Sequence, residues 1–562
     1  TEYDVATANP PYTDSADFGP ELKEFIEDNY KKPYKFNTNL YATFIKRCYD
    51  FTGKAGFVAM VHPPTFMYIK KFESVRKFMI DKAHLSFFVE WGYLGMFNPS
   101  ARVDSALYIL EKNNNPEKDA VFVKLNHLYE TKRYDALLEA YEKFLAGGSH
   151  ELLYTIPQAK LKIIKSWPFI YWISDEFREK FKGDTFEDSQ EVSLGLKTGN
   201  NEKFLRFHWE VLTPESLSTI TEANNWYLYQ KGGDYNKWFG NNWLVVNNNT
   251  TRNISASKLK MQKSLGVTAG RQSTKGASFR YKDCITFVDD GTMNVFLLND
   301  EQVYLYLGLL NSKLSAYLLS CFNPTVNKQA GDLKRIPLAF GDGVEEEKIT
   351  KLSRSCVELK KHKSQHQLGE ASYKSSPLLL NSKGLPLKDK IKHFLSYENH
   401  ISSQIAICES LVNALVFEVY GLNEHDEGMV LSQEGLCIGD LPISTSARDA
   451  YLAETEATKE FPLDAIREFI EKLPTKEFSA EERNAIESGF GTLYQSNNDL
   501  EEFCIRHKVN PINVWYWFKQ SNVIPQQRMH TLAMEFLADM IREILMEDED
   551  GIIPLVPNAG EK

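Results

Sequence analysis

The sequence predicts an α/β domain at the amino-terminal end, an α+β domain after it and a mainly helical region towards the carboxyl end. Three observations predict this order. Strand-like and helical patterns alternate over residues 1–125, short β-like runs rich in Gly and Asn follow over 191–345, and long helical patterns dominate from about 346. Strands that alternate with helices indicate a sheet covered on both faces. A chain of 562 residues is long enough for two to four domains.

The elements of the first region follow from local patterns. Continuous apolar runs indicate strands, and apolar residues that recur every three or four positions indicate helices. The expected strands are 3–8, 56–63, 85–92 and 103–112, and the expected helices are 39–51, 74–82 and 132–145. Because the last of these helices lies beyond the sheet, residues 126–190 are expected to form a helical connector.

Composition divides the remaining chain. Residues 346–440 are expected to form a helical region, and residues 441–562 an acidic helical domain. From 421 to 562 the sequence has 12 Lys/Arg and 27 Asp/Glu, so 12 − 27 = −15, whereas residues 191–340 have 17 and 12, so 17 − 12 = +5. The net charge of −11 therefore reflects the carboxyl-terminal part, and a local basic surface remains available for a phosphate partner.

The overall composition is that of an ordinary globular protein, with 43% hydrophobic and 25% charged residues. No run of about 18 apolar residues predicts a membrane span, and the first residues lack the basic-then-apolar pattern of a signal peptide. Seven cysteines lie far apart without a CxxC pair. These features predict a cytoplasmic protein with reduced thiols, without a metal site and without a membrane partner.

The stretch "DVATANPPYTD", residues 4–14, places Asn-Pro-Pro-Tyr at the end of a predicted strand. Two consecutive prolines cannot continue a strand, because each lacks an N–H group and has a fixed φ. Such a corner suits the methylation of an exocyclic amine. The Asn9 side-chain oxygen and the Pro10 carbonyl can accept the two N–H bonds of adenine N6, Pro11 fixes the direction of that carbonyl, and Tyr12 can stack on a base flipped out of the duplex. A plain strand-terminating turn is the alternative.

Three segments around this corner resemble the adenine-N6 type of amino-group DNA methyltransferases. "ANPPY" is similar to their catalytic motif, residues 39–67 resemble the helix, turn and strand that follow it, and residues 95–110 resemble the last hairpin of their catalytic sheet. The resemblance implies that Asn9, Pro11 and Phe44 bind the methyl donor, and that Phe97 is a second aromatic contact to the flipped base. Phe44 can equally be a core residue, and Phe97 an exposed loop residue.

Four further segments resemble the large methyltransferases of the BREX phage-defence system (PglX-like). They are residues 195–211, 226–242, 307–338 and 509–529. The resemblance implies that residues 1–125 are the carboxyl-terminal part of a Rossmann-like methyltransferase domain and that residues 191–345 are its target recognition domain. It implies S-adenosylmethionine as cofactor, with double-stranded DNA and other phage-defence proteins as partners.

The cofactor motif of this family is rich in glycine and precedes the catalytic motif, so it is expected before Thr1. The glycine pair in residues 487–495 is no substitute for it. The chain is therefore expected to be the carboxyl-terminal half of a longer protein. Alone, it is expected to be inactive and to bind no S-adenosylmethionine measurably, because half a pocket cannot enclose a small ligand.

A basic stretch in the predicted recognition domain is the candidate for DNA contact. It contains no acidic residue and eight basic ones: Arg252, Lys258, Lys260, Lys263, Arg271, Lys275, Arg280 and Lys282. The small residues between them would let the backbone approach phosphates, and the arginines could reach base edges. A solvated loop is the alternative. The dense aromatic residues of 226–243 are expected to be mostly core. Residues 499–523 are expected to form two helices that read DNA, dock a protein or belong to the core.

Two other functions remain open. One is a DNA-binding specificity module without chemistry, and the other is the methyltransferase half of a combined restriction-modification enzyme. Asn9 and Tyr12 distinguish the first of these from a methyltransferase, because a pure reader of DNA has no use for such a corner.

Overall fold

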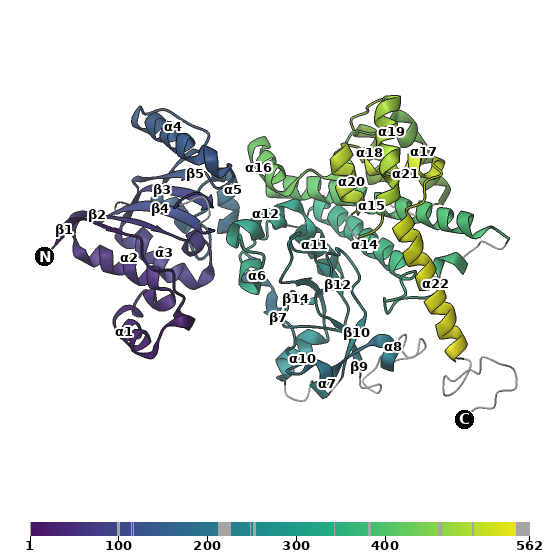
Figure 1. The fold of residues 1–562 in the computed structure, drawn as a ribbon, viewed down its shortest axis with the longest axis horizontal. Helices are drawn as coiled ribbons and strands as arrows, with labels where there is room; N and C mark the ends of the chain where they lie inside the picture. The colour runs from purple at the N-terminus through teal and green to yellow at the C-terminus, as the bar shows by residue number, and fades with distance from the viewer. Residues whose placement is uncertain are drawn as a thin grey trace. The chain divides into compact units, whose positions relative to one another are not determined.

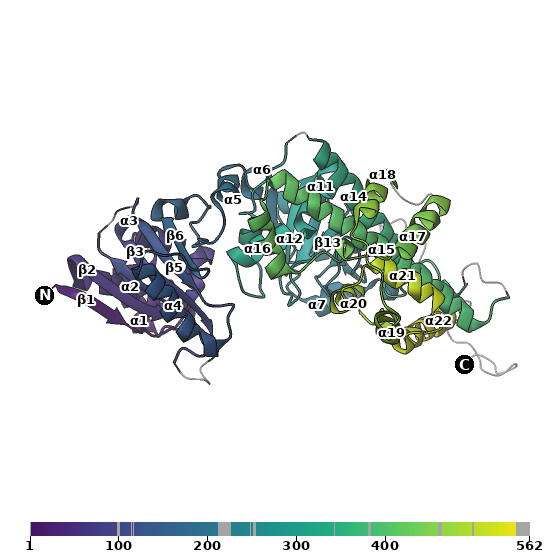
Figure 2. The same cartoon turned by 90° about the horizontal axis from the view of Figure 1, so that it is seen from above.

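The computed structural model describes residues 2–97, 102–113, 115, 117–211, 226–247, 249–250, 254–341, 343–379, 384–458, 463–496 and 499–546. The chain divides into two compact units, which are drawn in Figures 1 and 2 and are described here one at a time. The first unit contains residues 1–186, 318–325 and 334–338, and the second contains residues 187–317, 326–333 and 339–562.

A six-stranded sheet forms the centre of the first unit, in the order β1-β2-β4-β3-β5-β6. Its strands are β1 (Tyr3–Ala8), β2 (Thr52–His62), β3 (His84–Tyr93), β4 (Asp104–Glu111), β5 (Asp119–Lys124) and β6 (Leu153–Pro157). β1 is parallel to β2 and β3 is parallel to β5, whereas β4 runs antiparallel between β2 and β3. The alternation of strands and helices predicts this mixed α/β class, which the structure confirms.

β6 extends the sheet into residues 126–190, where the helical pattern predicts a connector. It pairs antiparallel with β5, so that Ala120 lies opposite Ile156 and Phe122 opposite Tyr154. This pairing satisfies the backbone groups along the outer edge of β5. A five-residue strand of this kind carries too little periodicity to be recognised in the sequence.

Helices cover the two faces of this sheet unequally (Figure 1). α2 (Leu40–Phe51) lies on the face that carries His62, because the rings of Tyr41 and His62 stack 4.4 Å apart, and α3 (Glu73–Lys82) packs beside α2. α4 (Arg133–Leu145) lies on the opposite face, where Tyr141 contacts Phe87. This second face is covered less completely, since the side chains of Phe57 and Ile109 are 40% and 38% exposed.

Two four-stranded sheets make up the β-rich part of the second unit. One has the order β13-β9-β10-β8 and the other has the order β12-β11-β14-β7. The strands are β7 (Glu191–Leu194), β8 (Leu205–Phe207), β9 (Trp226–Gln230), β10 (Leu244–Asn247), β11 (Leu265–Gly270), β12 (Arg280–Lys282), β13 (Thr286–Val288) and β14 (Thr292–Leu298). The short helix α10 (Ala256–Gln262) precedes β11, and α11 (Asp300–Asn311) follows β14.

Long helices dominate the rest of the second unit, as the sequence predicts. They are α14 (Val344–Ser364), α15 (Leu387–Tyr420), α16 (Glu424–Glu434), α17 (Thr445–Thr458), α18 (Leu463–Lys472), α19 (Ala480–Ser488), α20 (Asp499–His507), α21 (Pro511–Gln520) and α22 (Gln526–Met546). α15 is long and apolar enough to cross a membrane by length and composition, but 78% of its most apolar window is buried inside the protein. It serves as the central core helix against which α14 and α21 pack.

His400 on α15 makes the second unit sensitive to acid. Its ring lies between Tyr451 and Trp515, and burial lowers the pKa of His400 to about 4. An unfolded imidazole titrates near pH 6.5, so the unfolded chain binds more protons between about pH 6.5 and 4, and stability is lost as the pH falls through this window.

We expect His400→Phe to reduce the loss of unfolding free energy between pH 7 and pH 4 by up to about 3 kcal/mol. Urea unfolding at several pH values measures the slope, which is independent of any constant packing cost of the substitution. The same substitution at the exposed His425 is the matched control and should leave the slope unchanged. Equal slopes in the wild type and in His400→Phe would contradict the assignment.

Candidate functional site

The carboxyl ends of several strands meet at one edge of the first sheet. β1, β2, β3 and β5 run in the same direction, because β4 is antiparallel to both β2 and β3. Residues 9–12 directly follow β1 and therefore lie at this edge. Ligands of open α/β sheets bind in the crevice outside the carboxyl ends of the strands. The Asn-Pro-Pro-Tyr corner is thus at the position where such a sheet places its chemistry.

A hydrogen bond joins the two polar side chains of the corner. The Tyr12 hydroxyl donates to Asn9 Oδ1 at 2.8 Å. Asn9 and Pro11 are exposed, Pro10 is buried, and Tyr12 is half-buried, which raises the pKa of its hydroxyl. The bond orients the Asn9 amide, while the second lone pair of Oδ1 can accept another N–H group. The buried Pro10 fixes the backbone between the two side chains.

Asn39, at the amino end of α2, holds the corner through a hydrogen bond to its backbone. Its Nδ2 donates to the Tyr12 carbonyl at 3.3 Å, and its Oδ1 accepts from the Tyr41 N–H at 3.1 Å. The Leu40 N–H also donates to the Thr13 carbonyl at 2.9 Å. Asn39 is not among the residues predicted for the site, although an Asn directly before a helical pattern is a signal for a capping residue.

Asp14 and Lys71 form an ion pair beside the corner, with Lys71 Nζ 2.5 Å from Asp14 Oδ2. Burial alone would raise the pKa of Asp14, but the hydrogen bonds from Lys71 and from the Ala16 N–H outweigh it and lower the pKa. Both side chains are more than 40% exposed, so this pair contributes little to stability. It is a further link between the corner and the segment after β2.

An apolar cavity of about 650 Å³ opens next to Asn9 on the face that α4 covers. Its walls include Val61, Leu107, Leu138 and Tyr141. Phe44, which is half-buried, does not line this cavity and belongs to α2 on the other face of the sheet. Walls of this kind suit the packing of apolar groups better than the binding of a charged methyl donor.

Phe97 lies at the same sheet edge as the corner but on a different strand end. It follows β3 and is 46% exposed, as expected for a loop aromatic residue. β2 and β4 lie between β1 and β3, so the two strand ends are three inter-strand spacings apart, roughly 14 Å. The contacts of Phe97 and of Phe44 with a base and a methyl donor stay predictions.

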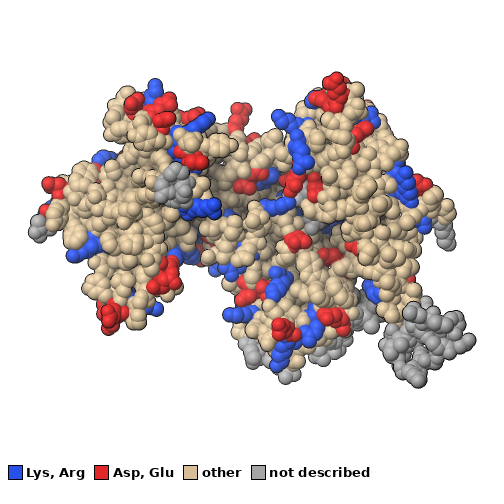
Figure 3. Space-filling model, in the orientation of Figure 1, with Lys and Arg blue, Asp and Glu red and all other residues tan. Residues whose placement is uncertain are grey.

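The eight basic residues do not form one surface. Lys258, Lys260 and Lys263 lie on or directly after α10, before β11, whereas Arg271 and Lys275 lie beyond the other end of this strand. Six residues of strand separate the two groups by about 20 Å. Arg252 lies outside the described residues. On the face drawn in Figure 3, Lys and Arg are interspersed with Asp and Glu.

Arg280 and Lys282 are buried in β12, so their expected contact with DNA is wrong. Lys282 Nζ donates to the carbonyls of Gln262 and Ser264, both at 2.7 Å, and burial lowers the pKa of Lys282 to about 7. Arg280 Nη2 donates to the Gly232 carbonyl at 3.2 Å. The two side chains alternate with Tyr281 along the strand and therefore share its inner face. They hold the domain together rather than face a ligand.

The loop between β11 and β12 remains a candidate nucleic-acid interface. Arg271 and Gln272 line a polar cavity of about 350 Å³ together with Lys231 and Asn327. Four glycines, at 232, 233, 270 and 291, lie in the same wall and leave the backbone open to close approach. Lys275, further along the loop, is exposed and pairs with Glu502 at 2.7 Å. Lys231 is not among the residues predicted to contact DNA, because it lies in the separate loop after β9.

The remaining candidates belong mainly to the core. Trp238 and Tyr227 are buried at 1% and 5% exposure, as expected for most of the aromatic residues between 226 and 243. α20 and α21 form the predicted helix pair, but α21 buries Trp515, Trp517 and Phe518. A helix buried along its length cannot enter a DNA groove, so the reading of DNA by α21 is contradicted.

Comparisons with known proteins confirm the resemblance inferred from the sequence. Residues 1–97 match a family described as the Eco57I restriction-modification methylase. The adenine-specific methyltransferase BrxX of Escherichia coli O9:H4 (strain HS) is 24% identical over 433 residues, which cover 75% of this chain and 34% of BrxX. The adenine-specific methyltransferase PglX of Lacticaseibacillus casei (strain Zhang) is 23% identical over 466 residues, which cover 75% of this chain and 37% of PglX.

The chain thus spans about a third of the length of the curated relatives that it matches, at 34% and 37%. Among solved structures, the Type IIL restriction-modification enzyme MmeI in complex with DNA aligns with a TM-score of 0.42 at 10% identity, over 76% of this chain and 56% of MmeI.

Proposed function

We propose that this chain, a relative of the adenine-specific methyltransferases BrxX and PglX of BREX systems, carries the catalytic corner and the DNA recognition part of a site-specific adenine-N6 DNA methyltransferase of a phage-defence system. The observation that carries the proposal is the Asn9–Tyr12 pair at the carboxyl edge of the first sheet. It combines a hydrogen-bond acceptor with an aromatic ring on a rigid proline frame.

The corner acts on the target amine through acceptors that are already in place. The nitrogen lone pair of adenine N6 is delocalised into the ring, so the amine is a poor nucleophile. When Asn9 Oδ1 and the Pro10 carbonyl accept its two N–H bonds, the nitrogen becomes more pyramidal and its lone pair is directed away from the ring. Tyr12 stacks on the flipped base. When bound, the donor would lose its S–CH3 bond as the N6–CH3 bond forms and would leave as a neutral thioether. No general base is needed, since the methylated N6 is then acidic enough to lose its proton to water.

S-adenosylmethionine supplies the methyl group in this proposal. Asn9 and Pro11, both exposed at the sheet edge, fit one wall of the donor site. Phe44, half-buried on α2, is the candidate for an apolar contact. Asn9 also lines the cavity on the other face, but most of its walls are apolar and suit a charged donor poorly, so the exposed side of Asn9 and Pro11, with Phe44, is proposed to face the donor.

Transfer of a labelled methyl group to duplex DNA tests this function. The protein that carries this chain is incubated with S-adenosylmethionine and DNA, and the digested nucleosides are analysed by mass spectrometry. N6-methyladenine is the expected product. DNA binding without any methylated base would favour a specificity module without chemistry and would contradict the role of the corner.

Neutralising the loop interface should weaken DNA binding and its salt dependence. Each phosphate contact that is lost lowers the slope of log affinity against log salt by about 0.9, so the triple variant Lys231→Gln, Arg271→Gln and Lys275→Gln should lower it by up to about 2.7. Titration of labelled duplex at several salt concentrations measures this slope.

The matched comparison is the triple variant Lys258→Gln, Lys260→Gln and Lys263→Gln at the other end of β11. We expect a smaller change in slope there, because these residues lie apart from the glycine-rich wall. A normal slope for the loop variant, together with a reduced slope for the α10 variant, would move the DNA contact to α10.

A further inference from the structure

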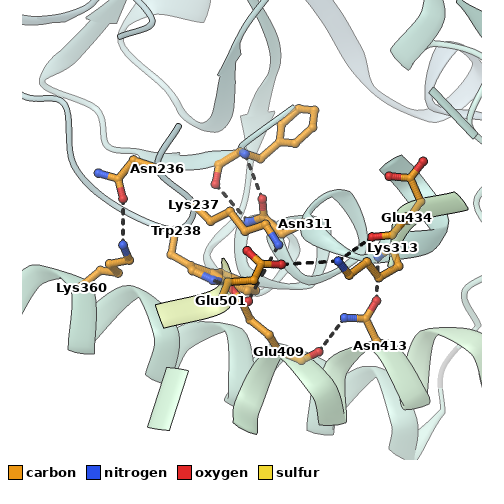
Figure 4. A network of polar contacts seen from close by, with 11 residues as sticks. Asn236, Lys237, Trp238, Asn311, Lys313, Lys360, Glu409, Asn413, Glu434 and Glu501 are labelled. Carbon is orange, nitrogen blue, oxygen red and sulfur yellow. Dashed lines mark hydrogen bonds and ion pairs between the residues drawn. The ribbon is translucent and has the colours of Figure 1, made fainter. Parts of the chain in front are cut away.

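A cavity of about 100 Å³ in the second unit is lined by four lysines, which is unusual for a protein interior. Figure 4 shows Lys237, Lys313 and Lys360 together with the carboxylates of Glu409 and Glu501. The side chains of Lys237, Lys313 and Lys363 are 15%, 15% and 16% exposed. The four lysines come from the loop after β9, the start of α12 (Lys313–Phe322) and the end of α14.

Three of these lysines have a carboxylate partner, and Lys363 shares its partner, Glu398, with Arg528. Lys237 Nζ lies 3.8 Å from Glu409 Oε2, and burial, which alone would lower the pKa of Lys237, is outweighed by Glu409 and neighbouring groups, so that the pKa is raised. Lys313 Nζ lies 3.6 Å from Glu501 Oε1 and donates to the Glu434 carbonyl at 2.9 Å. The positive charges of Lys237 and Lys313 are therefore balanced by the carboxylates of Glu409 and Glu501.

The other two lysines are compensated poorly. Lys360 Nζ donates to the neutral amide oxygen of Asn236 at 2.9 Å (Figure 4). Lys363 Nζ donates to Ser402 Oγ at 3.1 Å and lies 3.6 Å from Glu398, which already accepts hydrogen bonds from Arg528. Burial and the nearby Lys363 lower the pKa of Lys360 to about 8.

The charges on the walls of the cavity do not balance. The residues that line it include four lysines and two carboxylates, Glu409 and Glu501, so 4 − 2 = +2. Further carboxylates, Glu398, Glu370 and Asp499, act on Lys360 and Lys363 from outside the lining. Buried charges are normally paired or bind an ion, so a dianion would complete the arrangement.

Two buried hydroxyl groups of the cavity wall also have no partner. Ser410 Oγ and the Tyr494 hydroxyl belong to residues that are 1% and 8% exposed, and neither makes a hydrogen bond to any residue that the structure describes. A buried polar group without a partner is costly, and each of these hydroxyls can donate to an oxyanion. Water would satisfy the hydroxyls but would leave the excess charge.

We propose that this cavity binds a small tetrahedral oxyanion of the phosphate class, held by Lys360 and Lys363 and by the hydroxyls of Ser410 and Tyr494. The volume supports a free ion, because it is well below the roughly 300–1,000 Å³ of sites for larger organic ligands and leaves no room for a nucleotide. The bound ion joins α14 to α15 and to the segment before α20, and so stabilises the second unit.

Thermal unfolding of the whole protein in inorganic phosphate tests the site. Ionic strength is held constant with chloride. A specific site gives a rise of Tm that follows the logarithm of the phosphate concentration above the dissociation constant, about 2 °C at ten times that constant. General stabilisation by phosphate rises in proportion to its concentration and is shared by all variants. Isothermal titration calorimetry with phosphate should give a stoichiometry of one.

Lys360→Met should weaken phosphate binding about tenfold or more, because it removes a charge-assisted hydrogen bond. It should not lower Tm in chloride, since it also removes a poorly compensated buried cation. Lys351→Met on the same helix, where the side chain is 66% exposed, is the matched control and should bind phosphate normally. A rise of Tm with phosphate that is the same in the wild type and in both variants would mean that the site does not exist.

Tyr494→Phe provides a second variant that leaves every charge in place. It should also bind phosphate more weakly, and wild-type affinity in a folded Tyr494→Phe protein would contradict the proposed contact. Duplex DNA separates the two sources of phosphate. Unchanged affinity for phosphate in saturating DNA supports a free ion, whereas a tenfold loss would show that the DNA backbone uses the cavity and would overturn the proposal.

Discussion

Asn9→Ala is expected to lower methyl transfer to DNA by about 10²-fold or more, while DNA affinity stays within a few fold. The size of the loss is that found when one preorganised polar group is removed from an active site. Asn9 Oδ1 is already oriented by the Tyr12 hydroxyl at 2.8 Å, so alanine removes an acceptor that needs no rearrangement to meet the amine. Affinity is retained because phosphate contacts supply most of it.

Single-turnover methylation of a short duplex, in a form of the protein that is active, measures this effect without interference from product release. Asn29→Ala is the matched control, because Asn29 is also exposed and lies in the first unit but away from the corner. Tyr12→Phe keeps the ring and removes only the hydrogen bond, and should lose much less activity than Asn9→Ala. Near-normal methylation by Asn9→Ala would contradict the catalytic role proposed for the Asn-Pro-Pro-Tyr corner.

Glu398→Gln is expected to destabilise the second unit by about 3–5 kcal/mol, the usual effect of removing one partner of a buried ion pair. Glu398 is 4% exposed in its side chain and accepts from Arg528 Nε at 3.2 Å and from Arg528 Nη2 at 3.0 Å. Burial alone would raise the pKa of Glu398, but Arg528 and Lys363 outweigh it and lower the pKa. Glutamine keeps the shape but removes the carboxylate that Arg528 and Lys363 share.

Urea unfolding monitored by tryptophan fluorescence measures the loss. The control is Glu487→Gln, which removes the same charge from the partly exposed pair with Arg483 and should cost no more than about 1 kcal/mol. If both substitutions cost the same small amount, the Glu398–Arg528 pair is not buried in solution.

The Asn-Pro-Pro-Tyr corner was predictable because its conformation depends on residues that are adjacent in the sequence. Two prolines after a short strand fix the backbone whatever lies around them, and Asn9 and Tyr12 are close enough in sequence to meet. Asn39 was not predicted as part of the site, because its contact with Tyr12 joins positions 27 residues apart. A capping pattern indicates that a helix begins at such a residue, but not which loop the side chain reaches.

The positions of the charged residues could not be predicted from the sequence, because they depend on contacts between distant parts of the chain. In sequence, Arg280 and Lys282 continue a basic stretch that suits phosphate binding, and only the pairing of β11 with β12 turns them inwards. The carbonyls that accept from Lys282 come from the end of α10 and the residues after it. The lysine cavity has the same character: Lys237 and Lys360 are far apart in the chain, and no local pattern joins them.

The inward-facing side chains of β12 have a consequence for how target specificity can change. β11 and β12 pair with each other, with Thr268 opposite Arg280 and Gly266 opposite Lys282. The buried Lys282 ammonium group also donates hydrogen bonds to backbone carbonyls before β11. Residues 271–279 connect two anchored ends, and the entropy of closing a loop rises only slowly with its length. Ser278 and Phe279 at the end of the loop are buried. Under the proposed function, residues 274–277, which are not buried, can therefore be exchanged or lengthened as a cassette. Libraries randomised there would sample new DNA sites while the fold and the methyl-transfer corner stay intact.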